Sequence, residues 1–152
     1  MAKLKIIKIG DDTLRQKSRP VTEVTPRIRT LLDDMLDTMH AADGCGLAGP
    51  QVGVLRRVIV VEAESGHPYQ MVNPEILEQT GTQNEVEGCL SVPGEWGKVV
   101  RPAHVKVRYL DKDGQEQIVE GTGLLARALC HEIDHLNGIL FVDNATELES
   151  ES

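Results

Sequence analysis

Aromatic residues are scarce in this chain of 152 residues, which contains one Trp, one Phe and two Tyr. Because 40% of its residues are hydrophobic, the chain can still bury the core of one domain, and that core must be aliphatic. Basic residues are outnumbered by acidic ones, and the formal net charge is −8. This balance argues against a protein whose general surface grips phosphate backbones, although an acidic protein can still meet nucleic acid through one local patch.

Long apolar runs and cysteines are also few. No stretch approaches the roughly 18 consecutive apolar residues of a membrane span, and residues 1–9 lack the apolar core and cleavage site of a signal peptide. The three cysteines (Cys45, Cys89 and Cys130) are an odd number, which suits reduced thiols or a metal ligand better than a disulfide framework. We therefore expect a cytoplasmic protein with no membrane association.

An amphipathic helix is predicted near the N-terminus. Thr25 and Pro26 form a typical helix start, with an N-cap hydroxyl followed by proline at the first helical position. Apolar residues then recur at spacings of three and four up to Met39, and Gly44 is a plausible terminator. This pattern predicts a scaffold helix that buries one face.

Strand signals fill the middle of the chain, and a second helix is predicted from Thr122 or Gly123 to about Asn137, with Gly138 as its left-handed terminator. The repeated β-α-β alternation of a doubly wound sheet is missing, so we expect an α+β fold with mainly antiparallel sheet around this second helix. Residues 1–142 are predicted to form one domain, and the acidic tail, residues 143–152, is expected to fray. The runs that predict strands are residues 58–61, 70–76, 98–100, 105–110, 117–120 and 139–142.

The second predicted helix carries the strongest chemical signal, His131-Glu132-Ile133-Asp134-His135. Residues four apart share one helix face, so His131 and His135 can grip one metal ion. Glu132 is then close enough to take a proton from a water at that metal. The simpler interpretation, a solvated helix turn with two histidines, is disfavoured by how rarely this spacing arises by chance.

A third protein ligand is needed, and Cys89 is the best candidate, because flanking glycine and proline fix its backbone in the stretch of residues 87–94. Cys130 precedes His131 and points about 100° round the helix from it, so we expect a small buried residue there. One Cys and two His leave a fourth position for water, which is the pattern of a catalytic site. Three further histidines are interpreted as structural or solvated: His40, His67 and His104.

A hydroxide that attacks a carbonyl generates an oxyanion, which needs hydrogen-bond donors. Gln51, at the end of a glycine-rich loop, offers a neutral amide, and the backbone N–H of Leu90 lies next to the cysteine. The same site also admits other interpretations. These are a zinc metalloprotease, a non-catalytic metal-binding module, and a Cys89 nucleophile with a histidine base. In the extended protease motif a third histidine would stand at Phe141, which disfavours the first of these.

Three motifs in this order resemble those of the peptide deformylase family: residues 44–51, 87–91 and 131–135. The resemblance extends from about Thr13 to Phe141. It implies a hydrolase that removes the N-formyl group from the N-terminal formyl-methionine of newly synthesised polypeptides. It assigns Cys89, His131 and His135 as metal ligands, Glu132 as general acid/base, and Gln51 and Leu90 to the oxyanion.

The resemblance also implies how substrate binds. The backbone of Cys45, Gly46 and Gly88 would pair with the peptide like an added strand, and Trp96 is expected to form a wall of its groove. The metal would be Fe²⁺ in the cell, with Zn²⁺, Ni²⁺ or Co²⁺ able to occupy the site. Nascent peptides and transient proximity to the ribosome are implied, and no direct nucleic-acid binding is expected. The residues that match the methionine side-chain pocket are Cys45, Glu85, Leu124, Arg127, Ala128 and His131.

Overall fold

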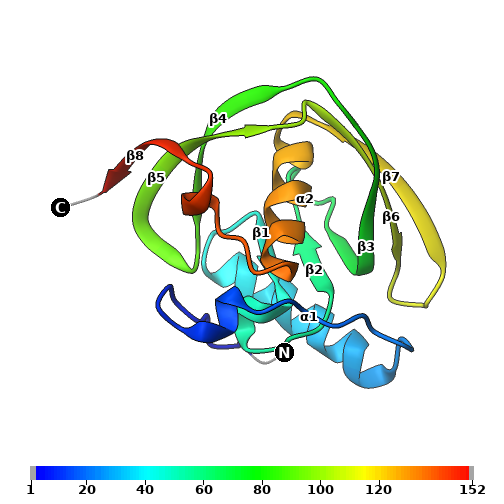
Figure 1. Ribbon diagram of the computed structural model, residues 1–152. Helices are drawn as coiled ribbons and strands as arrows, with labels where there is room; N and C mark the ends of the chain where they lie inside the picture. The colour runs from blue at the N-terminus through cyan, green and yellow to red at the C-terminus, as the bar shows by residue number, and fades with distance from the viewer. Residues whose placement is uncertain (1–2, 151–152) are drawn as a thin grey trace.

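The computed structural model describes residues 3–150, which form two antiparallel sheets and two α-helices. Helix α2 (Gly123–Leu136) lies at the centre beneath an arch of strands, and helix α1 (Pro26–Ala41) lies along the outer side (Figure 1). This confirms the α+β architecture with a central helix. No helix within residues 3–150 is long and apolar enough to cross a membrane.

All strand pairs in both sheets are antiparallel. The strands predicted for residues 58–61, 70–76, 98–100, 105–110 and 117–120 all lie within observed strands. The larger sheet has the order β1-β2-β3-β6-β7, with β1 Gly46–Ala48, β2 Val58–Val61, β3 Tyr69–Thr80, β6 His104–Leu110 and β7 Glu116–Thr122. The smaller sheet has the order β4-β5-β8, with β4 Gln83–Cys89, β5 Val92–Arg101 and β8 Thr146–Ser150.

A bend between the two sheets carries the chain over α2. Gly81 supports it with a left-handed φ of 69°, a conformation that glycine adopts without strain. The side-chain amide of Gln83 donates to the carbonyl oxygens of Pro102 and Gly123, each at 3.0 Å. These bonds join the start of β4 to the connection between β5 and β6 and to the first residue of α2. They help to hold the smaller sheet over the helix that carries the two histidines.

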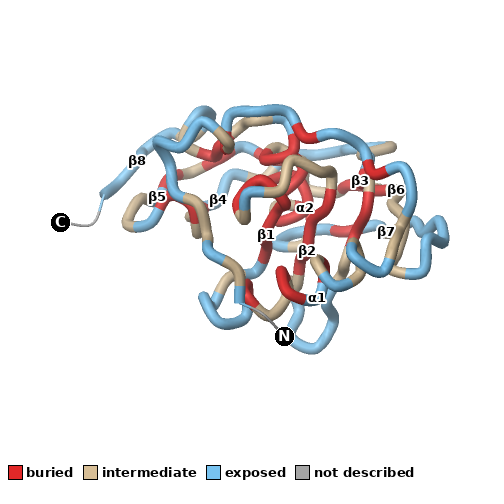
Figure 2. Tube along the Cα trace, turned by 90° about the horizontal axis from the view of Figure 1, so that it is seen from below, coloured by how far each residue is buried: buried red, intermediate tan, exposed pale blue. Residues whose placement is uncertain are grey.

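Strand β2 is buried on both faces and separates two aliphatic clusters. Val58 and Val60 pack in the cluster beneath α1, whereas Ile59 and Val61 pack in the cluster around α2. Because successive strand residues point to opposite faces, this alternation makes the sheet a layer between the two helices. Figure 2 shows the buried residues concentrated along β1, β2 and α2. The aliphatic core predicted from the composition therefore fixes α2 against a rigid sheet.

The N-terminal strap (residues 3–29) crosses the ends of several elements before it enters the first turn of α1. Its backbone donates from Ile7 to the carbonyl of Gln51 at 2.7 Å, and from Ile9 to the carbonyl of Ser91 at 2.8 Å. Ser18 donates to the carbonyl of the last α2 residue at 2.8 Å. Thr25 caps α1 as predicted, because its hydroxyl accepts from the Ile28 N–H at 3.3 Å.

Two segments near the C-terminus differ from expectation. The strand predicted for residues 139–142 is wrong: Leu140 is extended, and a 3-10 helix, η3, covers Phe141–Asp143. Leu140 and Phe141 are both buried, which breaks strand alternation, and the Asp143 carboxylate accepts from the Leu140 N–H at 3.0 Å.

Residues 146–150 form strand β8, although fraying is expected for the tail. Strand β8 pairs with β5 through Trp96 and Glu149, and all of its side chains are exposed. Strand pairing uses backbone groups, so an acidic sequence does not prevent it. The division of the chain into residues 1–142 and a tail of residues 143–152 stays a prediction.

Candidate active site

Helix α2 carries His131, Glu132 and His135 in its last two turns, and all three side chains are buried. The two imidazole rings lie on one face, with ring centroids 5.0 Å apart. Burial of three polar side chains on one helix is costly unless each finds a partner. The neighbouring strand β4 supplies partners for one nitrogen of each histidine, whereas Glu132 Oε1 and His135 Nδ1 have none within residues 3–150.

Cys89 is the last residue of β4, where the chain turns back into β5. The pairing register shifts between Glu87 and Cys89, a local irregularity of the kind that re-aims a side chain. The Cys89 Sγ lies 3.3 Å from Nε2 of His135. One donor atom from each of Cys89, His131 and His135 falls within 4.8 Å of the others. The three predicted ligands are therefore together.

The donor set fits a divalent transition metal. One thiol and two imidazoles suit borderline-soft ions, and three protein donors leave a further coordination position open. His131 Nδ1 lies 2.9 Å from Oε1 of Glu87, so that bond orients the ring and leaves Nε2 for a metal. The tautomer is assigned from this contact.

The surroundings of the two histidines shift their pKa values in opposite directions. Burial, reinforced by repulsion from His131, lowers the pKa of His135 well below its ordinary value. The ring of His135 is thus held neutral, as a metal ligand must be. Burial also acts to lower the pKa of His131, but the nearby Glu132, Cys89 and Glu87 outweigh it, and the pKa of His131 is raised. His131 therefore sits in an anionic environment that favours a cation.

Arg101 clamps the carboxylate that orients His131. Its Nε and Nη2 each donate to Glu87 at 3.0 Å, and its Nη1 donates to Asp134 at 2.6 Å. Burial opposes ionisation of Glu87, but its bonds to His131 and Arg101 prevail and lower its pKa. The result is a chain of charge-assisted contacts that runs from half-buried Asp134 to buried His131.

Glu132 lies beside the donor cluster with its carboxylate in a confined space. Its Oε1 is buried and has no hydrogen-bond partner within residues 3–150, and Oε2 lies 4.0 Å from Nε2 of His131. Gly46 of β1 faces it so closely that a Cβ at Gly46 would collide with Oε2. Burial raises the pKa of Glu132 to about 7. A carboxyl with that pKa can both take and give a proton near neutral pH.

Gln51 is held rigidly next to Cys89 in the 3-10 helix η2 (Gly49–Val52). Its Oε1 accepts from the backbone N–H of Ala48 at 2.9 Å. Its Nε2 lies 3.1 Å from Oγ of Ser91 and 3.6 Å from Sγ of Cys89. The amide N–H₂ therefore points toward the donor cluster. Leu90 follows Cys89 in the tight turn between β4 and β5.

These groups line one cavity of about 590 Å³. Glu132 and His131 contribute to its wall, whereas fully buried His135 lies behind it. Glu85 is exposed on β4 and outside the lining, so the structure does not support its predicted place in the side-chain pocket; its neighbour Val86 lines the cavity instead. The other predicted binding residues all line it: Cys45, Gly46, Gly88, Leu124, Arg127 and Ala128.

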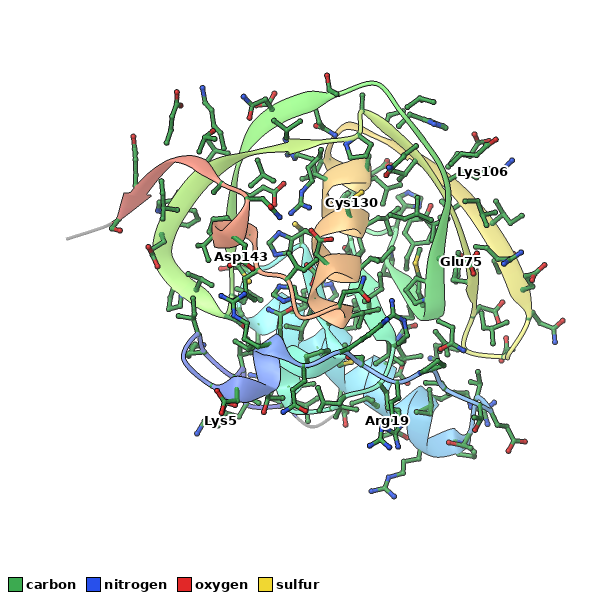
Figure 3. The ribbon with its side chains drawn as sticks, in the orientation of Figure 1. Lys5, Arg19, Glu75, Lys106, Cys130 and Asp143 are labelled. Atoms are coloured by element: carbon green, nitrogen blue, oxygen red, sulfur yellow. The ribbon has the colours of Figure 1, made fainter. Side chains whose placement is uncertain are left out.

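Trp96 forms part of the cavity mouth, as expected. Its ring covers Gly88 so closely that any Cβ at that position would collide with it. Cys130 belongs to the core and not to the site: it packs with the aliphatic cluster around α2, and burial raises the pKa of its thiol to about 11 (Figure 3). Cys89 is thus the thiol at the donor cluster.

The supporting residues Glu87, Arg101 and Asp134 were not predicted. Glu87 lies within a motif, but nothing local distinguishes a buried carboxylate from a solvated one. Arg101 follows it by fourteen positions and Asp134 by forty-seven, and the three residues meet only because β4, β5 and α2 pack together. The sequence held one weak signal for this role of Arg101, which is its position at the end of a strand, directly before Pro102.

Comparison with known proteins places these features in a family context. The family model described as polypeptide deformylase matches residues 3–151. A peptide deformylase of Alkaliphilus metalliredigens is 57% identical over 141 residues, covering 92% of this chain and 95% of the relative. One from Thermoanaerobacter pseudethanolicus is 56% identical over 138 residues, covering 91% and 86%.

Solved structures agree in fold. A peptide deformylase from Thermotoga maritima superposes with a TM-score of 0.93 at 37% identity, covering 96% of this chain and 99% of that one. One from Synechococcus elongatus, solved in complex with actinonin, gives a TM-score of 0.92 at 42% identity and covers 97% and 84%.

Proposed function

Because this chain belongs to the polypeptide deformylase family, we propose that it hydrolyses the N-formyl group from the N-terminal formyl-methionine of newly synthesised polypeptides and releases formate. The observation that carries the proposal is the convergence of Cys89, His131 and His135 at one point, with the carboxylate of Glu132 beside them in the cavity wall. An open coordination position next to a buried base is the arrangement that hydrolysis of an amide requires.

Cys89, His131 and His135 would hold one divalent ion. When bound, that ion supplies a Lewis acid and lowers the pKa of water. We propose Fe²⁺ as the ion in the cell, with Zn²⁺, Ni²⁺ and Co²⁺ as alternatives that the same donors accept. Glu87 supports this role because it fixes the ring of His131, and such outer partners typically contribute about 10- to 100-fold to metal affinity.

Glu132 moves the protons. Its carboxylate accepts a proton from the attacking water as the water oxygen bonds to the formyl carbon. The same carboxyl then gives that proton to the amide nitrogen as the C–N bond breaks, which leaves formic acid and a free amine. The acid ionises to formate, and its proton passes to the amine. Burial raises the pKa of Glu132, so the buried carboxylate is a stronger base than a solvated one and is suited to accept the proton of water.

Gln51 and Leu90 stabilise the charge that develops on the formyl oxygen. Gln51 Nε2 is aimed by the bond that its Oε1 accepts from Ala48, and the Leu90 backbone N–H lies in the turn after Cys89. A fixed donor of this kind is worth about 10²- to 10³-fold in rate. Because both donors are held by local structure, they need no reorganisation during the reaction.

The substrate peptide binds between two free sheet edges. Strand β1 ends the larger sheet and β4 ends the smaller one, and the cavity lies between them. The backbone at Cys45, Gly46 and Gly88 would pair with an extended peptide as an added strand. The methionine side chain would enter a pocket built from α2 residues Leu124, Arg127 and Ala128. We also propose a cytoplasmic location and transient proximity to the ribosome, since nascent chains are the substrate.

A metalloprotease is the competing function, favoured by the spacing of the two histidines around Glu132. The position that a third protease histidine would take is held by Phe141, whose ring stacks on His131 with centroids 6.1 Å apart and an interplanar angle of 23°. The third donor comes from Cys89 instead. Both features support deformylation over internal peptide cleavage.

The test combines metal analysis with formate release from a formyl-Met peptide, and an unformylated Met peptide serves as the control substrate. Glu132→Gln should keep one metal ion per chain and lower kcat by about 10²- to 10⁴-fold. Cys89→Ser is the matched variant that should lose metal. Iron samples are kept anaerobic, because a thiolate site is open to oxidation. Full activity of Glu132→Gln, or cleavage within the unformylated peptide, would show the proposal to be wrong.

A further inference from the structure

The positive charge of this acidic protein is concentrated in the N-terminal strap. Eight of the sixteen Lys and Arg residues lie within residues 3–29, against three of the twenty-four Asp and Glu residues. The strap therefore has a formal charge of +5, and the remaining residues together have −13. The eight cations are Lys3, Lys5, Lys8, Arg15, Lys17, Arg19, Arg27 and Arg29.

Seven of these eight cations form no ion pair with a carboxylate within residues 3–150. Within residues 3–150, Arg15 is the one strap cation that forms an ion pair with a carboxylate, that of Asp143. In the rest of that range, five of the eight cations are paired with acidic side chains: Lys98, Arg101, Lys106, Arg108 and Lys112. In a protein with more acidic than basic residues, we expect most Lys and Arg side chains to form an ion pair with a carboxylate. The strap is thus a distinct electrostatic region.

The strap presents its charges outward. Lys3, Lys5 and Lys8 are exposed, and the first two are spaced by two residues in an extended segment, which puts them on one side. Lys5 and Arg19 both lie along the lower side of the molecule, away from the arch formed by the smaller sheet (Figure 3). Exposed cations that lie on one side of a molecule attract an extended polyanion.

The apolar residues of the strap point inward. Leu4 and Ile6 pack against the cluster beneath α1, and Leu14 is buried beneath the smaller sheet. A segment that binds a lipid surface instead places large apolar side chains beside its cations, usually on an amphipathic helix. The strap lacks that arrangement, because Ile9 is the one large hydrophobic residue that is exposed within residues 3–29. Its chemistry therefore suits phosphate groups rather than acyl chains.

We propose that the N-terminal strap is a docking surface for the phosphate backbone of RNA. The acidic remainder of the protein repels RNA, so only this side can approach, and the complex has one orientation. Lys8 belongs to the strap and also lines the active-site cavity, with its Nζ 3.4 Å from the carbonyl oxygen of Leu90. Docking through the strap thus holds the cavity mouth beside the RNA. This departs from the expectation, based on total charge, of no nucleic-acid contact.

The test measures binding of a fluorescein-labelled RNA hairpin to the metal-loaded protein by anisotropy at several salt concentrations. Lys3→Gln/Lys5→Gln/Lys17→Gln removes three strap charges. Lys98→Gln/Lys106→Gln/Lys112→Gln is the matched control, because it changes the net charge equally but removes ion-paired lysines outside the strap. The strap variant should bind at least about tenfold more weakly at low salt, with a shallower salt dependence, and the control should bind like wild type.

Three outcomes would overturn the proposal. The first is no detectable RNA binding by wild type at about 50 mM salt, where non-specific sites still bind. In the second, both triple variants lose affinity for the RNA hairpin equally, which would show that binding depends on total charge and not on the strap. In the third, wild type binds vesicles of anionic lipid more tightly than the hairpin. Melting curves of all variants check folding, and formate release, expected to be unchanged in the strap variant, keeps this result separate from the proposed function.

Discussion

Two arginine–glutamate pairs in this protein have the same chemistry and opposite surroundings. Arg101 donates through Nε and Nη2 to both oxygens of Glu87, and the two side chains are 6% and 7% exposed. Arg108 donates through Nη2 to both oxygens of Glu75 at 3.2 Å, and these side chains are 42% and 60% exposed. The first pair adjoins the donor cluster, whereas the second joins β6 to β3 far from it.

Burial decides what each pair contributes. In water the attraction between charges is screened, and an exposed pair is worth about 0–1 kcal/mol. In the interior, both charges have lost their hydration, so each depends on the other and on further partners. Arg101 also bonds to Asp134, and Glu87 also bonds to His131. The buried pair is therefore best understood as a rigid connection between two sheet strands and α2, and the exposed pair as a local contact.

The largest predicted effect comes from removing the buried cation. Arg101→Ala leaves the buried carboxylate of Glu87 and the half-buried one of Asp134 without their cation and should lower the free energy of unfolding by about 3–5 kcal/mol. Urea unfolding of the metal-loaded protein measures it. Arg108→Ala is the control and should cost no more than about 1 kcal/mol. Equal losses in the two variants would show that the difference in burial has no energetic consequence.

A smaller effect is predicted for the carboxylate that orients His131. Glu87→Gln keeps the size of the side chain but weakens its bonds to His131 and Arg101, so metal affinity should fall by about 10- to 100-fold. Competition with a chelator of known affinity measures the change. Glu75→Gln, the matched variant at the exposed pair, should bind metal as wild type does. A Glu87→Gln protein with unchanged metal affinity would mean that the ring of His131 is oriented by packing alone.

The sequence predicted the parts of the site that depend on local pattern. The spacing of His131 and His135 on one helix identifies them as a pair of metal ligands, and this inference does not depend on the rest of the fold. Cys89 could be selected because few other donors had a fixed backbone. The connection from Glu87 through Arg101 to Asp134 depends on how β4, β5 and α2 pack together, which local sequence does not specify. Strand β8 was missed for the same reason, since its polar residues become a strand only because β5 offers a free edge.

The smallest predicted effect concerns pH and the exposed side of the larger sheet. Asp111 lies in the turn between β6 and β7, and its carboxylate accepts backbone N–H groups, chiefly that of Gln115, which lower its pKa below 3.8. A lowered carboxyl pKa stabilises the fold above the unfolded pKa, and this contribution is lost as pH falls through the folded value. Asp111→Asn should therefore melt at a temperature that depends less on pH below about pH 4.

Thermal melts of wild type and Asp111→Asn between about pH 3 and pH 7 make this comparison. Asp113→Asn, in the same turn, is the control, because it removes one carboxylate from the turn and leaves that of Asp111 in place. A variant at Asp111 whose melting temperature follows pH as steeply as wild type would contradict the assigned role of the turn carboxylate.

The depth of the reactive groups has a consequence for timing. Glu132 is 4% exposed and His135 is fully buried, so the peptide proposed as the substrate would reach them as an extended end between strands β1 and β4. An end that has already paired or packed within its own protein can no longer enter. Removal of the formyl group therefore competes kinetically with the folding of the substrate. A ribosome needs roughly 5–20 s to synthesise a 100-residue domain, and that interval sets how fast this enzyme must find each new chain.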